Sequence, residues 1–213
     1  MKKALITGHA GFIGSHLFKA LNEHGWAVTG ADLKTGQDIR DMDLPKVDMC
    51  FHLAAQSNAH STAFYEDATH NIMATLRLLQ KYEARVVFAS SAAIHQPFTS
   101  YALSKWTSEH YCRIYEARIV RMCNITGPGG HGVFEKFAAA ERLRIAGTGD
   151  QMRAYAPVRR AVDLFIKAAA SPPGSLHLLP GVEMSVLDIA DIMYPHKPRD
   201  FVEQVAADLP DIR

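Results

Sequence analysis

A glycine-rich turn between an apolar run and an amphipathic segment constrains the fold of this chain more than any other feature. Residues 3–7 form an apolar run typical of a buried strand, and residues 12–24 carry apolar side chains at helical spacing. Gly8 permits a tight turn between them, Gly11 lets a pyrophosphate approach the helix N-terminus, and Gly14 allows close packing of helix on strand. The sequence therefore predicts a dinucleotide-binding turn.

A carboxylate follows the second predicted strand, residues 26–31. Asp32 comes eighteen residues after Gly14, where an acidic side chain can accept hydrogen bonds from an adenosine ribose. The same charge repels a 2′-phosphate, so the pattern favours NAD over NADP. Lys34 lies nearby and leaves NADP open.

Apolar runs and longer amphipathic segments continue to alternate along the chain. We expect the following strands and helices: strands at 47–53, 85–89 and 117–122, and helices at 63–82, 100–115, 134–144, 162–169 and 186–193. This alternation predicts an α/β fold, a Rossmann-type doubly wound parallel sheet with a small, reduced C-terminal cap. Residues 1–123 would form the NAD-binding domain, and residues 124–213 a reduced substrate-binding region interleaved with it.

Composition argues against several classes of protein. The chain has 213 residues with 23 Lys+Arg and 22 Asp+Glu, and this net charge of +1 argues against nucleic-acid binding. No apolar run approaches the ~18 residues of a membrane span, and the first residues lack a signal-peptide cleavage pattern. Cys50, Cys112 and Cys123 lie in apolar segments, and no His/Cys group has zinc spacing. We expect a soluble, cytoplasmic protein with reduced thiols and no metal site.

A tyrosine and a lysine four residues apart lie on the helix predicted at 100–115. Tyr101 and Lys105 therefore share one helical face, and an ammonium near a phenol lowers the pKa of the phenol toward that of a general base. Ser91 lies just past a strand end, at the edge where α/β proteins bind ligands, and it could share a substrate oxygen with Tyr101. A solvent-facing Tyr/Lys pair is the alternative interpretation.

Together these motifs resemble the extended short-chain dehydrogenase/reductases, in particular the NAD-dependent nucleotide-sugar epimerase/dehydratase family. The matching segments follow family order along most of the chain: TGHAGFIG (7–14), Asp32, DIRD (38–41), HLAAQS (52–57), Asn71, FASSAAIH (88–95), YALSK (101–105), RMCNITGP (121–128) and GTGDQMR (147–153). The resemblance implies an enzyme with NAD as cofactor, a nucleotide sugar as substrate, and a homodimer.

The resemblance also implies a role for individual residues. The catalytic group would be Ser91, Tyr101 and Lys105. The NAD site would contain Gly8, Gly11, Phe12, Ile13, Gly14, Asp32, Asp38, Ile39, Leu53, Ala54, Ala55 and Asn71, together with Tyr101 and Lys105. The substrate would contact Gln56, Ser91, Asn124 and Arg153, the last at its diphosphate. The helices at 63–82 and 100–115 would pair in the homodimer through Leu76, Leu79, Trp106 and Tyr111.

Three departures from the family pattern accompany these matches. Family chains are usually longer, which implies a reduced substrate-binding region. Only ten positions separate Ser91 from Tyr101, so the site is expected to be open. The segment from Arg153 to Arg160 lacks the acidic residues that the family has there.

The residues after Ser91 distinguish the reactions within the family. Dehydratases have an Asp-Glu pair there, decarboxylases favour a Glu, and enzymes that epimerise at C3 and C5 use a nearby Cys. This chain has Ala92 and Ala93, which favours 4-epimerisation through a transient 4-keto intermediate, with Tyr101 as base and then acid. The alternatives are an NAD(P)-dependent oxidoreductase of a sugar nucleotide or a small ketone or alcohol, and a non-catalytic NAD-binding sensor or scaffold.

Overall fold

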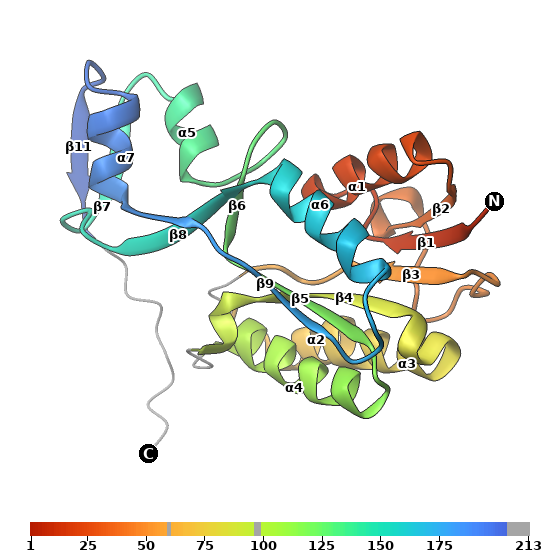
Figure 1. Cartoon of the computed structure of the whole chain (residues 1–213). Helices are drawn as coiled ribbons and strands as arrows, with labels where there is room; N and C mark the ends of the chain where they lie inside the picture. The colour runs from red at the N-terminus through yellow and green to blue at the C-terminus, as the bar shows by residue number, and fades with distance from the viewer. Residues whose placement is uncertain (59–60, 96–98, 204–213) are drawn as a thin grey trace. The chain divides into compact units, whose positions relative to one another are not determined.

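The chain folds into two compact units in the computed structural model, which describes residues 1–58, 61–95 and 99–203. The first unit contains residues 1–122 and 159–179, and the second contains residues 123–158 and the chain from 180 onward. Figure 1 labels their helices and strands. The first unit therefore includes one segment, residues 159–179, from the C-terminal third of the sequence.

Six strands form the sheet of the first unit, and every pair of neighbours is parallel. In spatial order they are β2 (Ala27–Ala31), β1 (Lys3–Thr7), β3 (Met49–His52), β4 (Val86–Ser91), β5 (Arg118–Met122) and β9 (Leu176–Leu179). The predicted Rossmann-type sheet is confirmed. The chain leaves β1 for β2 on one side and later returns to β3 on the other, so the crevice at which such sheets bind ligands lies between the carboxyl ends of β1 and β3.

Helices cover both faces of this sheet, with α1 and α6 on one face and α2, α3 and α4 on the other (Figure 1). The helical elements are α1 (Phe12–Glu23), η1 (Leu33–Thr35), α2 (Phe64–Asp67), η2 (Ala68–Met73), α3 (Ala74–Tyr82), η3 (Glu83–Arg85), η4 (Ala92–His95), α4 (Ser100–Ile114) and α6 (Val158–Ala169). The helix predicted at 63–82 is one run from α2 to α3, with a π-helical middle in η2. Among the described residues, no helix has both the length and the apolar character needed to cross a membrane.

The core of the first unit explains why its strands are continuous apolar runs in the sequence. Leu5, Cys50 and Phe88 from three neighbouring strands are fully or almost fully buried, and they belong to one cluster with Leu78 and Cys112 from the helices. Both faces of a parallel sheet are covered, so its strands need not alternate apolar and polar residues. Cys50 and Cys112 are free thiols in this core.

One residue expected at a subunit interface is buried instead. Leu79 lies in the core cluster and is 0% exposed, so the expectation that it meets a second subunit is wrong. Tyr111 also packs partly against this cluster, whereas Trp106 is 44% exposed. Helical spacing places Leu79 and Trp106 on amphipathic helices, but only the packing shows which face each helix turns inward.

The second unit has two small sheets. In one, β8 (Met152–Pro157) pairs antiparallel with β10 (Val182–Ser185) and parallel with β6 (Asn124–Thr126). In the other, β7 (Leu143–Ala146) pairs with β11 (Arg199–Val202). Phe137 of α5 (Val133–Ala139) and Ile189 of α7 (Val186–Met193) share a core with Leu143 and Ile145. The predicted helix at 186–193 is confirmed.

The helix predicted at 134–144 is wrong over its second half. α5 ends at Ala139, and residues 143–146 form β7. Leu143 and Ile145 are buried while Arg144 between them is exposed, the period of two that a strand produces. The Leu143 N–H donates to the carbonyl of Pro198, a partner far along the chain that local sequence does not reveal.

Candidate active site

The turn after β1 requires its glycines because backbone segments approach one another closely there. Gly8 adopts φ +74°, and a Cβ on it would lie 2.7 Å from the backbone nitrogen of Ala54, which follows β3. A Cβ on Gly14 would lie 2.0 Å from the Gly8 carbonyl oxygen. The Gly11 N–H donates to that same oxygen at 3.0 Å. The fold thus brings the predicted turn and the segment after β3 together at the crevice between β1 and β3.

The start of α1 suits a diphosphate. Gly11 precedes Phe12 and Ile13 and has no side chain with which to cap the helix, and the first turn contains no acidic residue. Backbone N–H groups at a helix start have no intrahelical acceptor, and the helix dipole favours negative charge there. A Cβ on Gly11 would lie 3.1 Å from the Gly8 carbonyl oxygen, so a larger residue would crowd the turn. The residues present therefore fit the pyrophosphate of a dinucleotide.

Asp32 joins the end of β2 to the glycine turn. One carboxylate oxygen accepts from the Lys34 N–H at 2.9 Å, and the other accepts from the Ala10 N–H at 3.1 Å. A carboxylate has about four acceptor positions, so both oxygens retain the capacity to accept from ribose hydroxyls. The geometry is compatible with the role predicted for Asp32.

Asp38 and Ile39, which the family resemblance places beside the adenine of NAD, have partners within the protein. The Arg40 guanidinium donates to both carboxylate oxygens of Asp38 and lowers the pKa of that carboxyl to about 2. The Ile39 side chain is buried in the core, and its carbonyl accepts from Arg77. Any adenine contact from this segment would therefore use backbone atoms or the outer edge of the ion pair.

Asn71 fixes the segment after β3. Its side-chain oxygen accepts from the Gln56 N–H at 2.8 Å, and its amide nitrogen donates to the Gln56 carbonyl at 3.2 Å. The same nitrogen donates to the Ser104 hydroxyl on α4 at 2.8 Å. Leu53, Ala54 and Ala55 therefore lie in a segment that is held at both ends. At its start, the Leu53 N–H donates to the Thr7 carbonyl of β1 at 3.1 Å.

Ser91, Tyr101 and Lys105 meet at the carboxyl end of β4. The Ser91 side chain hydrogen-bonds the Tyr101 phenol. Lys105, one turn further along α4, is buried, and its Nζ donates to the Ala89 carbonyl at 2.8 Å. That Nζ lies 6.0 Å from the centroid of the Tyr101 ring. The structure therefore brings together the three residues that the sequence predicted as a group.

The electrostatics of this group differ from the expectation. Burial raises the pKa of Tyr101, and the hydrogen bond with Ser91 acts in the opposite direction. Burial also lowers the pKa of Lys105 to about 8. The expected lowering of the phenol pKa by Lys105 is therefore not found: the ammonium is directed at the Ala89 carbonyl, and desolvation disfavours both charged forms.

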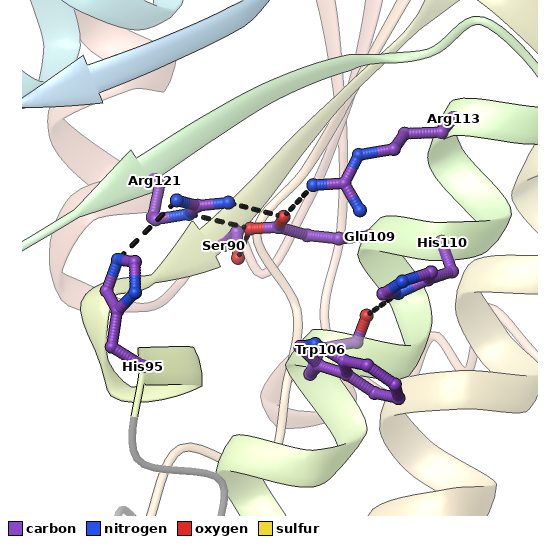
Figure 2. A network of polar contacts seen from close by, with 7 residues as sticks. All are labelled: Ser90, His95, Trp106, Glu109, His110, Arg113 and Arg121. Atoms are coloured by element: carbon purple, nitrogen blue, oxygen red, sulfur yellow. Dashed lines mark hydrogen bonds and ion pairs between the residues drawn. The ribbon is translucent and has the colours of Figure 1, made fainter.

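A buried carboxylate beside this group was missed by sequence reasoning. Figure 2 shows Glu109 of α4, which is 1% exposed and accepts from Ser90 at 2.6 Å and from Arg121 at 2.8 and 3.0 Å. Arg113 donates to it at 2.9 Å. Burial opposes ionisation of Glu109, but hydrogen bonds from Arg121 and Ser90 outweigh it, and its pKa is lowered. This network ties α4 to β4 and β5. The sequence signal that could have indicated Glu109 is its position four residues after Lys105, on the same face of the helix.

Two predicted substrate residues belong to the second unit. Asn124 lies on β6, and its side chain donates to the Ala154 carbonyl at 3.1 Å. Arg153 lies on the neighbouring strand β8, where it is exposed and donates to the Met152 carbonyl at 2.8 Å. Both side chains therefore belong to the sheet β10-β8-β6 of that unit.

Comparison with known proteins points to one family. A model of the NAD dependent epimerase/dehydratase family matches residues 4–177. A protein of Methanocaldococcus jannaschii named "Putative UDP-glucose 4-epimerase" is 29% identical over 89% of this chain and 80% of its own length. A UDP-N-acetyl-alpha-D-glucosaminuronate decarboxylase of Bacillus cytotoxicus is 29% identical over 78% of this chain and 71% of its own.

The fold agrees with a solved structure of a related enzyme. The UDP-glucuronic acid 4-epimerase from Bacillus cereus, in complex with UDP-glucuronic acid and NAD, superimposes with a TM-score of 0.83 at 25% identity. The superposition covers 96% of this chain and 87% of that one.

Proposed function

The chain belongs to the NAD-dependent epimerase/dehydratase family, and from this premise we propose that it is an NAD-dependent nucleotide-sugar 4-epimerase. One observation carries the proposal: at the carboxyl end of β4, Ser91 hydrogen-bonds Tyr101 while Lys105 is buried one helical turn away. A substrate hydroxyl at this position would meet both a hydrogen-bonding group and a proton-transfer group.

The two positions directly after Ser91 carry no acid or base, and this separates epimerisation from the other family reactions. η4 begins with Ala92 and Ala93, and the Ala93 N–H donates to the Ser91 hydroxyl oxygen at 3.1 Å. Methyl groups transfer no protons, so these positions support neither elimination nor decarboxylation. Although this chain is similar to a decarboxylase, it has no carboxylate at positions 92 and 93.

The proposed mechanism uses Tyr101 twice. The phenolate removes the proton of the C4 hydroxyl as C4 becomes a ketone. After the 4-keto sugar has rotated to present its opposite face, the phenol returns a proton to the C4 oxygen. Ser91 orients the C4 oxygen, and Lys105 contributes positive charge near the phenolate while it is protonated. NAD, when bound, supplies the acceptor and then the donor of the C4 hydride. Gln56, Asn124 and Arg153 are proposed to contact the substrate, with the Arg153 guanidinium at the diphosphate.

A panel of nucleotide sugars tests the proposal, with UDP-glucose and UDP-glucuronic acid as the first probes because related proteins are named for them. Conversion to the C4 epimer without net NADH supports it. Net NADH formation would instead identify an oxidoreductase. NAD binding with no turnover of any nucleotide sugar would favour a sensor or scaffold.

Replacing Asp32 with alanine is expected to weaken NAD binding relative to NADP. The change removes an acceptor for the ribose hydroxyls and the charge that repels a 2′-phosphate. Calorimetry with both dinucleotides measures the affinity ratio. Asp41→Ala, which removes an exposed carboxylate elsewhere in the same region, is the matched control. An unchanged NAD/NADP ratio in Asp32→Ala would reject the assignment.

We also propose that the chain forms a homodimer through α4 and the helix beside it. α4 carries exposed apolar residues at helical spacing, Leu103, Trp106 and Ile114, and the Trp106 ring lies against that of His110, tilted by 52° with the centroids 4.3 Å apart. The neighbouring run from α2 to η2 adds Phe64, Tyr65 and Met73, which are also exposed. Exposed apolar residues of this density are typical of a subunit interface.

Trp106→Glu is expected to weaken the dimer by about 2 kcal/mol or more, roughly 30-fold in Kd, because a central aromatic residue is typically an interface hot spot. Light scattering over a range of protein concentrations measures the change. Leu33→Glu replaces an exposed leucine that follows β2, at the other end of the sheet order, and should leave association unchanged. A wild-type protein that is monomeric at tens of micromolar, or a Trp106→Glu dimer of unchanged affinity, would contradict the interface.

The cytoplasm is the location we propose. Cys50 and Cys112 are free and buried, as thiols in a reducing compartment commonly are.

A further inference from the structure

A buried aspartate lies beside the predicted catalytic tyrosine. Asp67 is the last residue of α2 and is 2% exposed. Its Oδ2 accepts from the hydroxyl of Ser100 at 2.5 Å, and Ser100 is the first residue of α4. Tyr101 is the next residue along the chain. An acidic side chain this well buried is uncommon without a specific partner.

The contact is one of a matched pair. Four residues after Asp67, Asn71 donates to the hydroxyl of Ser104 at 2.8 Å, and Ser104 is four residues after Ser100. The Ser104 hydroxyl in turn donates to the Tyr101 carbonyl at 2.8 Å. Two polar contacts from the neighbouring helical run therefore hold the turn of α4 that carries Tyr101, one on each side of it.

The backbone around this pair is unusual. Asn71 lies in η2, the π-helical segment that begins directly after Asp67, and such wide turns occur frequently at functional sites. The N–H of Ser100 also donates to the carbonyl of Ser61 at 3.1 Å. Because Ser100 begins α4, the Asp67 carboxylate lies at the N-terminal end of that helix, where the helix dipole is positive.

We propose that Asp67 is a positioning residue for Tyr101, whose buried carboxylate holds the first turn of α4 through Ser100 and places a negative charge beside the phenol. This role rests on the proposed function, in which Tyr101 exchanges the proton of the C4 hydroxyl. The charge raises the pKa of Tyr101 further, after burial and against the hydrogen bond with Ser91. Removing it should favour the phenolate.

The other titratable and polar groups near the phenol can be distinguished from Asp67. α4 contributes Lys105, whose Nζ is 6.0 Å from the ring centroid, and β4 contributes the uncharged Ser91. Four other titratable groups of the adjoining elements have partners elsewhere: His52 of β3 with Thr7 and Thr75, His70 of η2 with Arg40, His95 of η4 with Arg121, and Glu109 of α4 with Ser90, Arg113 and Arg121. Asp67 is thus the carboxylate that acts on the phenol in the described part of the chain.

A titration of the Tyr101 phenol tests the proposal directly. Phenolate absorbance is recorded against pH for the whole protein without substrate, and the Tyr101→Phe titration is subtracted to isolate this residue. Asp67→Asn keeps the size of the side chain and an acceptor for Ser100 but removes the charge, so the Tyr101 midpoint should fall by about one pH unit. The acid limb of kcat/KM should move to lower pH by the same amount. Glu66→Gln removes the same charge from the exposed neighbouring residue and should move neither.

A second pair of variants tests the positioning role and does not depend on whether Asp67→Asn folds. Ser100→Ala should lower kcat about tenfold with little change in KM, because the hydroxyl that holds the turn is lost. Ser100→Thr retains a hydroxyl and should restore most of the rate.

The outcomes separate this inference from the proposed function. A Tyr101 midpoint in Asp67→Asn equal to those of wild type and Glu66→Gln would overturn the inference, even in an active epimerase. Equal kcat for Ser100→Ala and wild type would also overturn it. A shifted midpoint in a protein that turns over no nucleotide sugar would support the effect of Asp67 on Tyr101 and reject the epimerase.

Discussion

Replacing Tyr101 with phenylalanine is expected to lower kcat by about 10²- to 10⁴-fold, which is the usual contribution of a positioned proton-transfer group. The substitution removes only the phenol oxygen, which hydrogen-bonds Ser91 at the carboxyl end of β4. The aromatic ring remains in place, so the affinity for NAD should stay within a few-fold. Steady-state kinetics on the active nucleotide sugar and calorimetry with NAD measure the two quantities.

Tyr111→Phe is the matched control for this variant. Tyr111 lies on the same helix, is partly buried and packs against the core, so the loss of its hydroxyl should leave kcat close to that of wild type. A Tyr101→Phe protein that retained more than half of the wild-type kcat would rule out the proposed acid/base role.

Gly14→Ala is expected to lower the free energy of unfolding by about 3 kcal/mol or more, and NAD binding with it. The new Cβ would lie 2.0 Å from the carbonyl oxygen of Gly8 and 2.8 Å from the carbonyl carbon. Both atoms are backbone, so no side chain can rotate away, and either α1 or the turn after β1 must shift. The higher helix propensity of alanine offsets only about 1 kcal/mol. Denaturant unfolding measures the loss.

Gly25→Ala separates this steric effect from the general effect of replacing a glycine. Gly25 follows α1 with φ +75°, and no atom lies within 4 Å of its Cβ position, so the expected loss is only the strain of about 1–2 kcal/mol. If the two variants unfolded at the same denaturant concentration, the close approach of α1 to the turn would contribute nothing to stability.

Sequence reasoning identified the first unit well because its signals are local. The apolar run at 3–7, the glycine turn and the helix after it follow one another without interruption, and each has its own pattern. The same holds for Tyr101 and Lys105, because a spacing of four residues on one helix fixes their common face. The strands of the second unit were not identified from the sequence, and the first two residues of β7 were predicted as the end of a helix.

The contacts that shape the candidate site come from residues far apart in the sequence. Asp67 and Ser100 are 33 residues apart, and Ser90 and Glu109 are 19 apart. Neither pair has a sequence motif, because a sequence does not show whether an acidic residue is buried or exposed. Only the packing of α4 against the sheet and against the run from α2 to α3 shows that both carboxylates are enclosed.

The sequence by itself determined the Rossmann-type sheet and the positions of the glycine turn and of Ser91, Tyr101 and Lys105, because these depend on local period and spacing. The family was indicated by the resemblance of its motifs to known proteins and is shown by the family model. The tertiary structure decided which side chains are buried, and with them the direction of the pKa shifts at the site: burial raises the pKa of Tyr101, where the spacing alone predicted a lowered one. It also decided that Leu79 belongs to the core and Trp106 to the surface. Burial is a property of the whole packed chain, and desolvation acts on a charge more strongly than a neighbour four residues away.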